Sequence, residues 1–366
     1  MVMDSNAGAI GSAARGRFVA GCVASIERTF RPHLPLYIVA ILFCSVSAAM
    51  AIAYGVPLSL SASELFLKAI PVFLFFVVTL AALRHLIHLM RVEKPERPIA
   101  AMGRWLVDAF LAGDRPGNVF HALLTFTPLM VSFVALKRVI PIIQPFSWDL
   151  TFADWDRALA FGNEPWQLLQ SFLGYPAITS AINVVYNLWL GVMFLCLFSQ
   201  AFARQTSRLR LQFLLAFAFT WFLGGNVLAV VFSSAGPCFF GRLGLAPDLY
   251  AAQMAYLHAA ASQWPVWSLG VQDLLWHSYV TGEGAVNGIS AMPSVHVTSS
   301  AIMMFLGWRL NRWAGIALTL FFAVILVGSV HLAWHYAVDG LAGILLAAIF
   351  WAAAGTIANR TIPASG

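Results

Sequence analysis

Two short stretches in the C-terminal part of the chain contain the residues best suited to chemistry. One is the run S-A-M-P-S-V-H at residues 290–296, and the other ends in His335 and Asp339. Because His335 and Asp339 are four residues apart, a helix beginning near Tyr336 would place both side chains on one face, about one turn apart. The carboxylate could then accept a hydrogen bond from one ring nitrogen of His335 and leave the other nitrogen free to attack. This spacing predicts a histidine nucleophile.

The first stretch has the features of a helix start that binds an anion. Pro293 suits the first turn of a helix, because an N–H group at that position would have no partner in any case. It places Ser294 and His296 beside the free N–H groups of the same turn, which favour a phosphate. The sequence thus predicts a phosphate environment next to a second histidine.

The amino-acid composition indicates that such a site belongs to a membrane protein. The chain has 366 residues, of which 60% are hydrophobic and 10% charged, and its mean hydropathy is +0.81. Soluble domains are about 45–50% apolar and about 25% charged. We therefore expect an all-α, polytopic helical bundle in a membrane, and the composition excludes a soluble globular protein, a disordered chain and a nucleic-acid-binding protein.

Eight apolar runs are long enough to cross the ~30 Å hydrocarbon core of a bilayer. They lie near residues 36–54, 66–83, 118–136, 180–203, 211–233, 290–308, 313–330 and 337–356. With the N-terminus in the cytoplasm, 16 of the 21 Lys and Arg residues fall on the cytoplasmic side, as expected for membrane proteins. Both histidine stretches then face the opposite side, so we expect a bacterial inner-membrane protein with a periplasmic site.

The remaining segments complete the expected organisation. Residues 1–33 form a basic cytoplasmic arm without a cleavable signal peptide, 34–116 a pair of spans with a basic loop, 117–358 the catalytic membrane domain and 359–366 a cytoplasmic tail. Two non-cytoplasmic segments rich in Trp and Pro, 137–179 and 234–289, predict interfacial helices that cover the site. The four scattered cysteines predict neither disulfides nor a metal site.

These motifs resemble those of the type 2 phosphatidic acid phosphatase superfamily. Pro293-Ser294-Val295-His296 is similar to its P-S-G-H motif, and His335 to Asp339 is similar to its H-x-x-x-D motif. Within the superfamily, the chain resembles the inositol phosphorylceramide synthase branch most. The similar features are the motifs S-A-M-P-S-V-H-V and H-Y-A-V-D-G-L-A-G, the 39-residue interval between the two histidines, and Gly236-Pro237. The resemblance covers roughly residues 130–356 and implies a six-helix lipid-phosphatase-like core.

The resemblance implies a phosphotransfer that needs no metal or other cofactor. His335 would attack phosphorus, Asp339 would orient it and balance its charge, and His296 would protonate the departing oxygen. Water or an alcohol such as inositol or a lipid alcohol would then release the phosphohistidine, with His296 as the base. The substrate would be a phospholipid or lipid phosphate, including sphingolipid chemistry, that reaches the site from the bilayer.

Two departures from the family pattern concern the phosphate contacts. The family's K-x₆-R-P motif aligns with Lys137 and Gln144-Pro145, so its lysine and proline are present and its arginine is replaced by glutamine. The serine-arginine pair that precedes the nucleophile in the family is replaced by Gly328-Ser329. With fewer guanidinium groups, the pattern favours a phosphodiester carrying one negative charge over a terminal phosphate. The residues predicted to bind the substrate are Ser294, Lys137, Arg138, Arg242, Gln144 and Tyr336.

Two other functions use the same residues. His331, His335 and Asp339 repeat at i, i+4 and i+8, so a continuous helix could present three metal ligands with His296 as a fourth, giving a metal-dependent membrane hydrolase. Gly328-Ser329 predicts a break in that helix. A transporter with a buried His/Asp proton relay is the second alternative.

Overall fold

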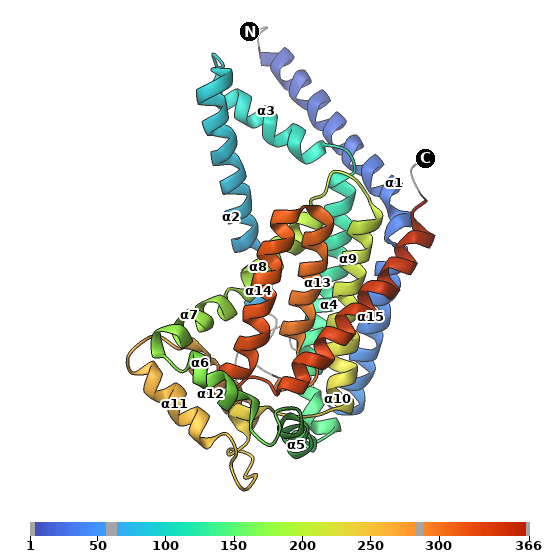
Figure 1. Cartoon of the computed structure of the whole chain (residues 1–366). Helices are drawn as coiled ribbons and strands as arrows, with labels where there is room; N and C mark the ends of the chain where they lie inside the picture. The colour runs from blue at the N-terminus through green and yellow to red at the C-terminus, as the bar shows by residue number, and fades with distance from the viewer. Residues whose placement is uncertain (1–3, 56–63, 283–287, 364–366) are drawn as a thin grey trace.

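The computed structural model describes residues 4–55, 64–282 and 288–363. The ends of the predicted basic arm and tail, residues 1–3 and 364–366, lie outside these ranges, as do residues 283–287 of the second covering segment. Within the described residues the chain is all-α, with helices packed into an elongated bundle whose N- and C-terminal ends lie at the same end (Figure 1).

Seven helical stretches of the described chain are long and apolar enough to cross a membrane, which makes this an integral membrane protein. They are Phe18–Ala53, Leu74–Glu93, Arg115–Ile143, Pro176–Ala201, Arg208–Val231, Arg312–His331 and Ala337–Thr361. The sequence predicts about eight spans, and the described residues contain seven such helices and one shorter helix at the remaining apolar run. The predicted sixth span is the helix α13 (Val295–Leu310), whose 16 residues correspond to about 24 Å, short of the ~30 Å core.

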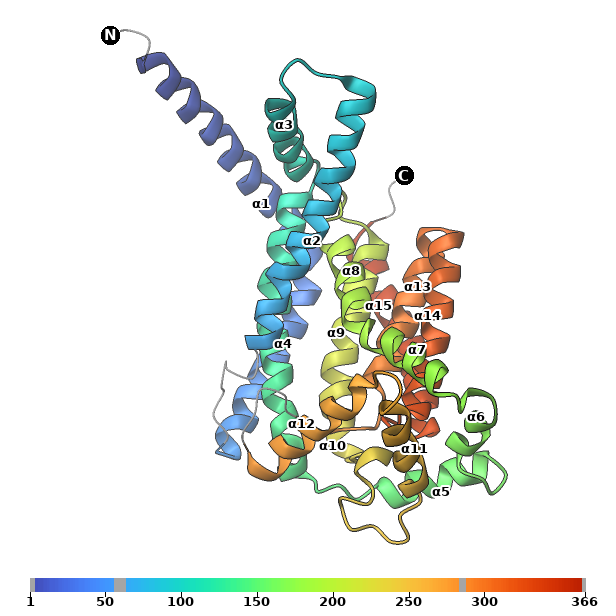
Figure 2. The same cartoon turned by 90° about the vertical axis from the view of Figure 1, so that its left-hand side faces the viewer.

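The first half of the chain supplies one side of the bundle. Its helices are α1 (Asp4–Ala53), α2 (Glu64–His88) continued by the π-helix η2 (Leu89–Glu93), α3 (Pro98–Leu111) and α4 (Arg115–Ile143). The predicted basic arm is helical where the structure describes it and runs into the first span without a break. Helix α1 packs along α4 in its C-terminal part, whereas its N-terminal part, α3 and the far end of α2 project beyond the rest of the bundle at the end that bears the termini (Figure 2).

The second half forms the other side and the far end. The helices that build it are α7 (Pro176–Asn187), α8 (Trp189–Ala201), α9 (Arg208–Phe219), the π-helix η3 (Thr220–Leu228), α10 (Ala229–Val231), α13, α14 (Arg312–His331) and α15 (Ala337–Thr361). Residue types explain the helix starts, since the Ser207 and Asn311 side chains accept backbone N–H groups at the N-termini of α9 and α14. Helix α13 packs mainly on α14, and α15 on α9.

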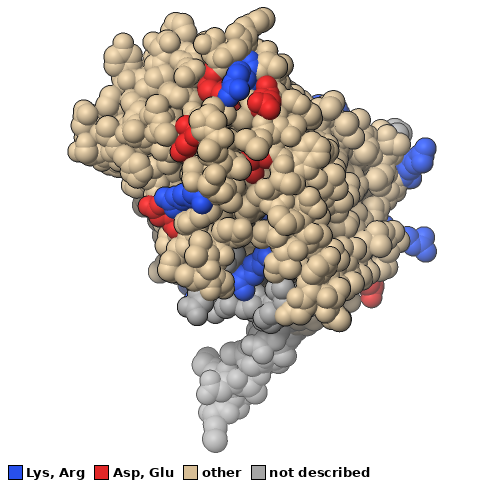
Figure 3. All heavy atoms as spheres, turned by 90° about the horizontal axis from the view of Figure 1, so that it is seen from below, with Lys and Arg blue, Asp and Glu red and all other residues tan. Residues whose placement is uncertain are grey.

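Short helices cover the end of the bundle opposite the termini. The first covering segment forms α5 (Asp149–Leu159) and α6 (Pro165–Leu173), and the second forms η4 (Pro237–Phe239), α11 (Ala251–Ala261) and α12 (Trp267–Thr281). Exposed aromatic side chains are frequent here, among them Phe161, Phe172, Tyr175, Trp264 and Trp267. Figure 3 looks onto this end and shows Lys, Arg, Asp and Glu scattered over a mainly uncharged surface. Aromatic residues are typical of the membrane–water interface.

Candidate active site

The turn that carries His335 connects α14 to α15. Helix α14 continues through Gly328-Ser329 to His331, so the predicted break comes a few residues later, at 332–336. The carbonyl of Ser329 accepts hydrogen bonds from the backbone N–H groups of Trp334 and His335 at 3.0 and 2.9 Å. Ala333 has φ +60°, a left-handed conformation that is uncommon for a residue with a Cβ. The turn is thus held by specific backbone contacts.

The ring of His335 is oriented through one nitrogen. Its Nδ1 lies 2.9 Å from the carbonyl oxygen of Ala291 and 3.3 Å from Oδ2 of Asp339. Since both neighbours are acceptors, Nδ1 carries the proton, and Nε2 keeps its lone pair. Burial lowers the pKa of His335 to about 4, partly opposed by the bond to Ala291, so the imidazole is neutral at neutral pH. This is the form that can act as a nucleophile.

Asp339 is fully buried in the first turn of α15. Its Oδ2 accepts the backbone N–H of Tyr336 at 3.0 Å as well as the His335 proton, while Oδ1 has no hydrogen-bond partner among the described residues. The backbone N–H of Ser294 donates to the carbonyl of Asp339 at 3.3 Å. This contact joins the start of α13, which carries His296, to the start of α15, just after the turn that carries His335.

His296 lies in the first turn of α13, close to His335. The centroids of the two rings are 6.0 Å apart and their planes meet at 60°. His296 also contacts the rings of Tyr186 and Trp189, at centroid distances of 5.0 and 4.1 Å. Two imidazoles therefore converge on one place, as a reaction at a single phosphorus atom requires.

Both histidines line a cavity of about 250 Å³. Its lining comprises Phe133, Lys137, Trp189, Trp221, Ala235, Phe239, Leu275, Gly288, Ile289, Ser290, Val295, His296, Trp334 and His335. The hydroxyl of Ser290 is buried and has no hydrogen-bond partner within the described chain. Lys137 is buried, with Nζ 5.5 Å from the centroid of the Phe133 ring. Among the described lining residues Lys137 is the only Lys or Arg, none is Asp or Glu, and half carry an aromatic or imidazole ring.

Five of the six residues predicted to bind the substrate do not line this cavity. Ser294 is fully buried and its hydroxyl caps α13 by accepting from Val297 N, at 3.3 Å. Gln144 donates to the Ser147 hydroxyl, and Arg242 forms an ion pair with Asp273. Arg138 is absent from the lining, and its buried Nε lacks a partner among the described residues. Tyr336 is fully buried and donates to Asp149.

Two acidic residues of the first covering segment hold the turn that carries His335, a role that no local sequence pattern predicted. Asp149 accepts from Tyr336 Oη at 2.8 Å and from the N–H groups of Ala235 and Gly236. Gly236 has φ +102°, and a Cβ at this position would lie 2.7 Å from the carbonyl oxygen of Trp334, so glycine lets the two segments approach. Burial raises the pKa of Asp149, opposed by these hydrogen bonds.

Asp156 binds the backbone at the start of α15, the helix that follows the turn. Its two carboxylate oxygens accept the N–H groups of Ala337 and Val338 at 2.7 and 2.9 Å, which satisfies the otherwise unpaired donors at the start of α15. Burial raises the pKa of Asp156 to about 7, and the nearby carboxyls of Asp339 and Glu164 add to the rise. In the sequence, this role of Asp156 is indicated only by the presence of an acidic residue in a short amphipathic segment.

His331 points away from the cavity. Its Nε2 lies 2.9 Å from the hydroxyl of Thr179, in the covering part of α7. Because the helix ends at His331, the i, i+4, i+8 repeat does not continue to His335 and Asp339 on one face. No group of three or more His, Cys, Asp or Glu side chains that could hold a metal ion is found in the described residues. The donor set for a metal-dependent hydrolase is therefore not assembled there.

Comparison with known proteins agrees with the chemistry of this cavity. A family model with the description PAP2 superfamily matches residues 150–353, which include both histidines and Asp339. No curated protein and no solved structure matches the chain significantly. The family match supports an enzyme of the phosphatase or phosphotransferase type that acts on lipids, in preference to a transporter. From the matched residues, which make up more than half of its length, the chain belongs to the PAP2 superfamily.

Proposed function

We propose that the protein is a membrane phosphotransferase or phosphatase that works through a phosphohistidine intermediate, with its reaction centre in the cavity beneath the covering helices. The observation that carries this proposal is the arrangement of His296 and His335 at one cavity, with ring centroids 6.0 Å apart and with Nδ1 of His335 bound to Asp339 and Ala291.

In the first step, Nε2 of His335 attacks phosphorus. The N–P bond forms as the ester P–O bond breaks, and His296 gives its proton to the departing oxygen. The phosphorylated ring carries a positive charge, which the carboxylate of Asp339 balances through Nδ1. General acid catalysis of this kind contributes about 10²–10⁴-fold to the rate.

In the second step, His296 takes a proton from water or from an alcohol, whose oxygen attacks phosphorus as the P–N bond breaks. Water gives a phosphatase reaction, and inositol or a lipid alcohol gives a transferase reaction of the inositol phosphorylceramide synthase kind. The same residues serve both outcomes, which differ only in the acceptor.

The charge of the cavity favours a phosphodiester as the donor. Among the described lining residues Lys137 is the only Lys or Arg, and the other polar groups are two histidines, the Ser290 hydroxyl and the indole N–H groups of three tryptophans. One ammonium group matches a phosphodiester with one negative charge, whereas a terminal phosphate carries nearly two at neutral pH. The aromatic lining suits a head group held in part by stacking.

The site belongs to the non-cytoplasmic side, which in a bacterial inner membrane is the periplasmic side. The excess of Lys and Arg at the other end of the bundle supports this orientation. The exposed aromatic residues of the covering helices suit an interface with lipid head groups, from which a lipid donor can enter.

The decisive experiment traps the intermediate. Purified protein is mixed with phospholipids whose phosphorus is labelled, with and without inositol or diacylglycerol, and quenched within one turnover. We expect label on His335 that survives base and is lost in acid, and a product that thin-layer chromatography identifies. A wild-type enzyme that turns over while no label is ever found on His335 would contradict the phosphohistidine mechanism.

A further inference from the structure

The two histidines of the cavity are positioned by different kinds of contact. Both hydrogen bonds of the His335 ring go through Nδ1, to Asp339 and Ala291. For His296, by contrast, the described residues provide no hydrogen bond to either ring nitrogen. A residue that must deliver a proton still needs a fixed ring orientation, so some other contact has to provide it.

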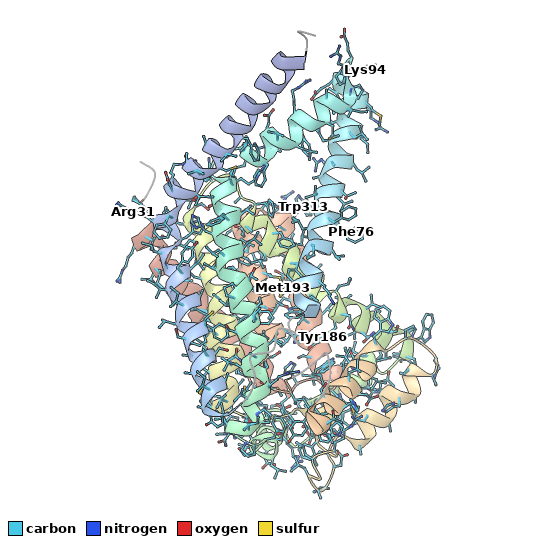
Figure 4. The ribbon with its side chains drawn as sticks, turned by 180° about the vertical axis from the view of Figure 1, so that it is seen from behind. Arg31, Phe76, Lys94, Tyr186, Met193 and Trp313 are labelled. Carbon is cyan, nitrogen blue, oxygen red and sulfur yellow. The ribbon has the colours of Figure 1, made fainter. Side chains whose placement is uncertain are left out.

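Contacts with two aromatic rings, one stacked and one tilted, orient the His296 ring instead. The ring of Tyr186 lies nearly parallel to that of His296, at 23° and a centroid distance of 5.0 Å, and the indole of Trp189 is closer, at 4.1 Å and 44°. Tyr186 lies near the end of α7 and Trp189 begins α8, so the break at Leu188 lets both contact one imidazole. Figure 4, seen from behind, labels Tyr186 inside the bundle near the covering helices.

Trp189 is also tied to the helix that carries His296. Its Nε1 donates to the hydroxyl of Ser299 at 2.9 Å, and this hydroxyl donates to the carbonyl of Val295 at 2.7 Å. Ser299 follows His296 by three residues on α13, about one turn. The indole therefore contacts α13 at two points one turn apart and keeps its place against the imidazole.

We propose that Trp189 is a positioning residue for His296, which it holds, together with Tyr186, in the orientation for proton transfer to the leaving oxygen. This inference rests on the proposed function. An aromatic face attracts an imidazolium ring without using either nitrogen. Aromatic contacts leave both ring nitrogens of His296 free to give and take a proton in turn. A carboxylate partner would instead bond to one nitrogen and fix the tautomer.

The test compares two phosphodiester substrates with the same phosphoryl head group. One has an alkyl alcohol as leaving group, which needs a proton, and the other has para-nitrophenol, which leaves as a stable anion. The first step alone is measured, as alcohol release in a single turnover or as the initial burst of para-nitrophenolate. We expect Trp189→Leu to slow the alkyl reaction about 10–100-fold, less than the about 10²–10⁴-fold of complete loss of general acid catalysis, because His296 is still present. The burst should slow less than about 3-fold, since no proton is needed.

Milder variants separate positioning from folding. Trp189→Phe keeps a stacking ring and should retain most of the alkyl rate. Ser299→Ala removes only the anchor of the indole and should slow the alkyl reaction by about 3–10-fold, less than loss of the ring, in line with one lost hydrogen bond. Ser300→Ala is its matched control, because the Ser300 hydroxyl is buried on the same helix and has no hydrogen-bond partner among the described residues. It should leave both rates unchanged.

The outcomes distinguish this inference from the proposed function. With Trp189→Leu added to His296→Ala, we expect no further loss of the alkyl rate, since both changes remove the same proton transfer. Equal slowing of both substrates by Trp189→Leu and by Ser299→Ala would overturn the positioning role. If His296→Ala itself slowed both substrates equally, the assignment of His296 as the acid would fail, and this inference with it.

Discussion

The hydroxyl of Tyr336 donates a 2.8 Å hydrogen bond to Asp149, a residue 187 positions earlier in the chain. The same carboxylate accepts backbone N–H groups of Ala235 and Gly236, so both covering segments and the turn that carries His335 meet at one buried acid. Tyr336 directly follows His335. The covering segments therefore set the position of the candidate nucleophile as well as closing the cavity above it.

Substitution of His335 and of His296 should distinguish the nucleophile from the general acid. We expect His335→Ala to abolish turnover and phosphohistidine formation, and His296→Ala to lower kcat by about 10²–10⁴-fold, with expression of both variants intact. Turnover of labelled phospholipid and phosphoryl transfer to the protein are the measurements. His277→Ala provides the control, because His277 is exposed on α12. Near-wild-type rates in either cavity variant would contradict the role given to that residue.

Asp339→Asn tests the charge next to the nucleophile. The amide is close in shape to the carboxylate, but it cannot balance the positive charge of a phosphorylated His335. We expect kcat to fall by about 10–100-fold or more, as for loss of a hydrogen bond to a charged group, with little change in KM. Kinetics in detergent micelles measure both constants. A variant with wild-type kcat would show that the carboxylate only shapes the turn.

Lys137→Met tests the contact to the anionic head group. Since a hydrogen bond to a charged group contributes about 1.5–3 kcal/mol, we expect KM for an anionic phosphodiester to rise by roughly 10–100-fold, with kcat less affected. Arg242→Met is the matched control, because Arg242 pairs with Asp273 outside the cavity. Equal effects of the two variants would argue against a direct role of Lys137.

The pH dependence of stability should report on Asp156. Its pKa is raised by burial to about 7, from 3.8 in a free side chain. Between these values the folded protein holds a proton that the unfolded chain has released. This contribution to the free energy of unfolding is therefore full below about pH 4 and declines as the pH rises to about 7.

Asp156→Asn removes the titration and should flatten the fall of the melting temperature between pH 4 and 7. Thermal unfolding in detergent at several pH values measures this slope. Asp154→Asn is the control on the same helix, since Asp154 is exposed. An unchanged slope in Asp156→Asn would show that Asp156 is ionised in the folded protein throughout this range.

The sequence predicted the elements of this fold where a local pattern determines the structure. Seven of the apolar runs form helices long enough to span, because apolar surface over that length is stable only in hydrocarbon. The run beginning at residue 290 forms a shorter helix. Ala291 N donates to the carbonyl of Ser234, and Met292 N donates to the Ser234 hydroxyl, so the chain stays non-helical until α13 begins at Val295.

Local spacing also predicted that His335 and Asp339 would be neighbours, and the structure has them 3.3 Å apart. The supporting contacts had no such signal. In the sequence Asp149 and Asp156 look like solvated charges between apolar segments, and Trp189 like an ordinary residue of a span. Their partners are more than 85 residues away in the chain, so only the folded arrangement reveals them.

Because Lys137 is the only Lys or Arg among the described lining residues, the two possible products should leave the cavity at different rates. Hydrolysis of a phosphodiester yields a phosphomonoester, which bears nearly two negative charges at neutral pH. Transfer to an alcohol yields another singly charged diester. One cation can neutralise the diester product, whereas the phosphomonoester keeps excess negative charge inside a low-dielectric cavity. We therefore expect a hydrolytic product to depart quickly and a transfer product to linger, long enough to run the reaction backwards.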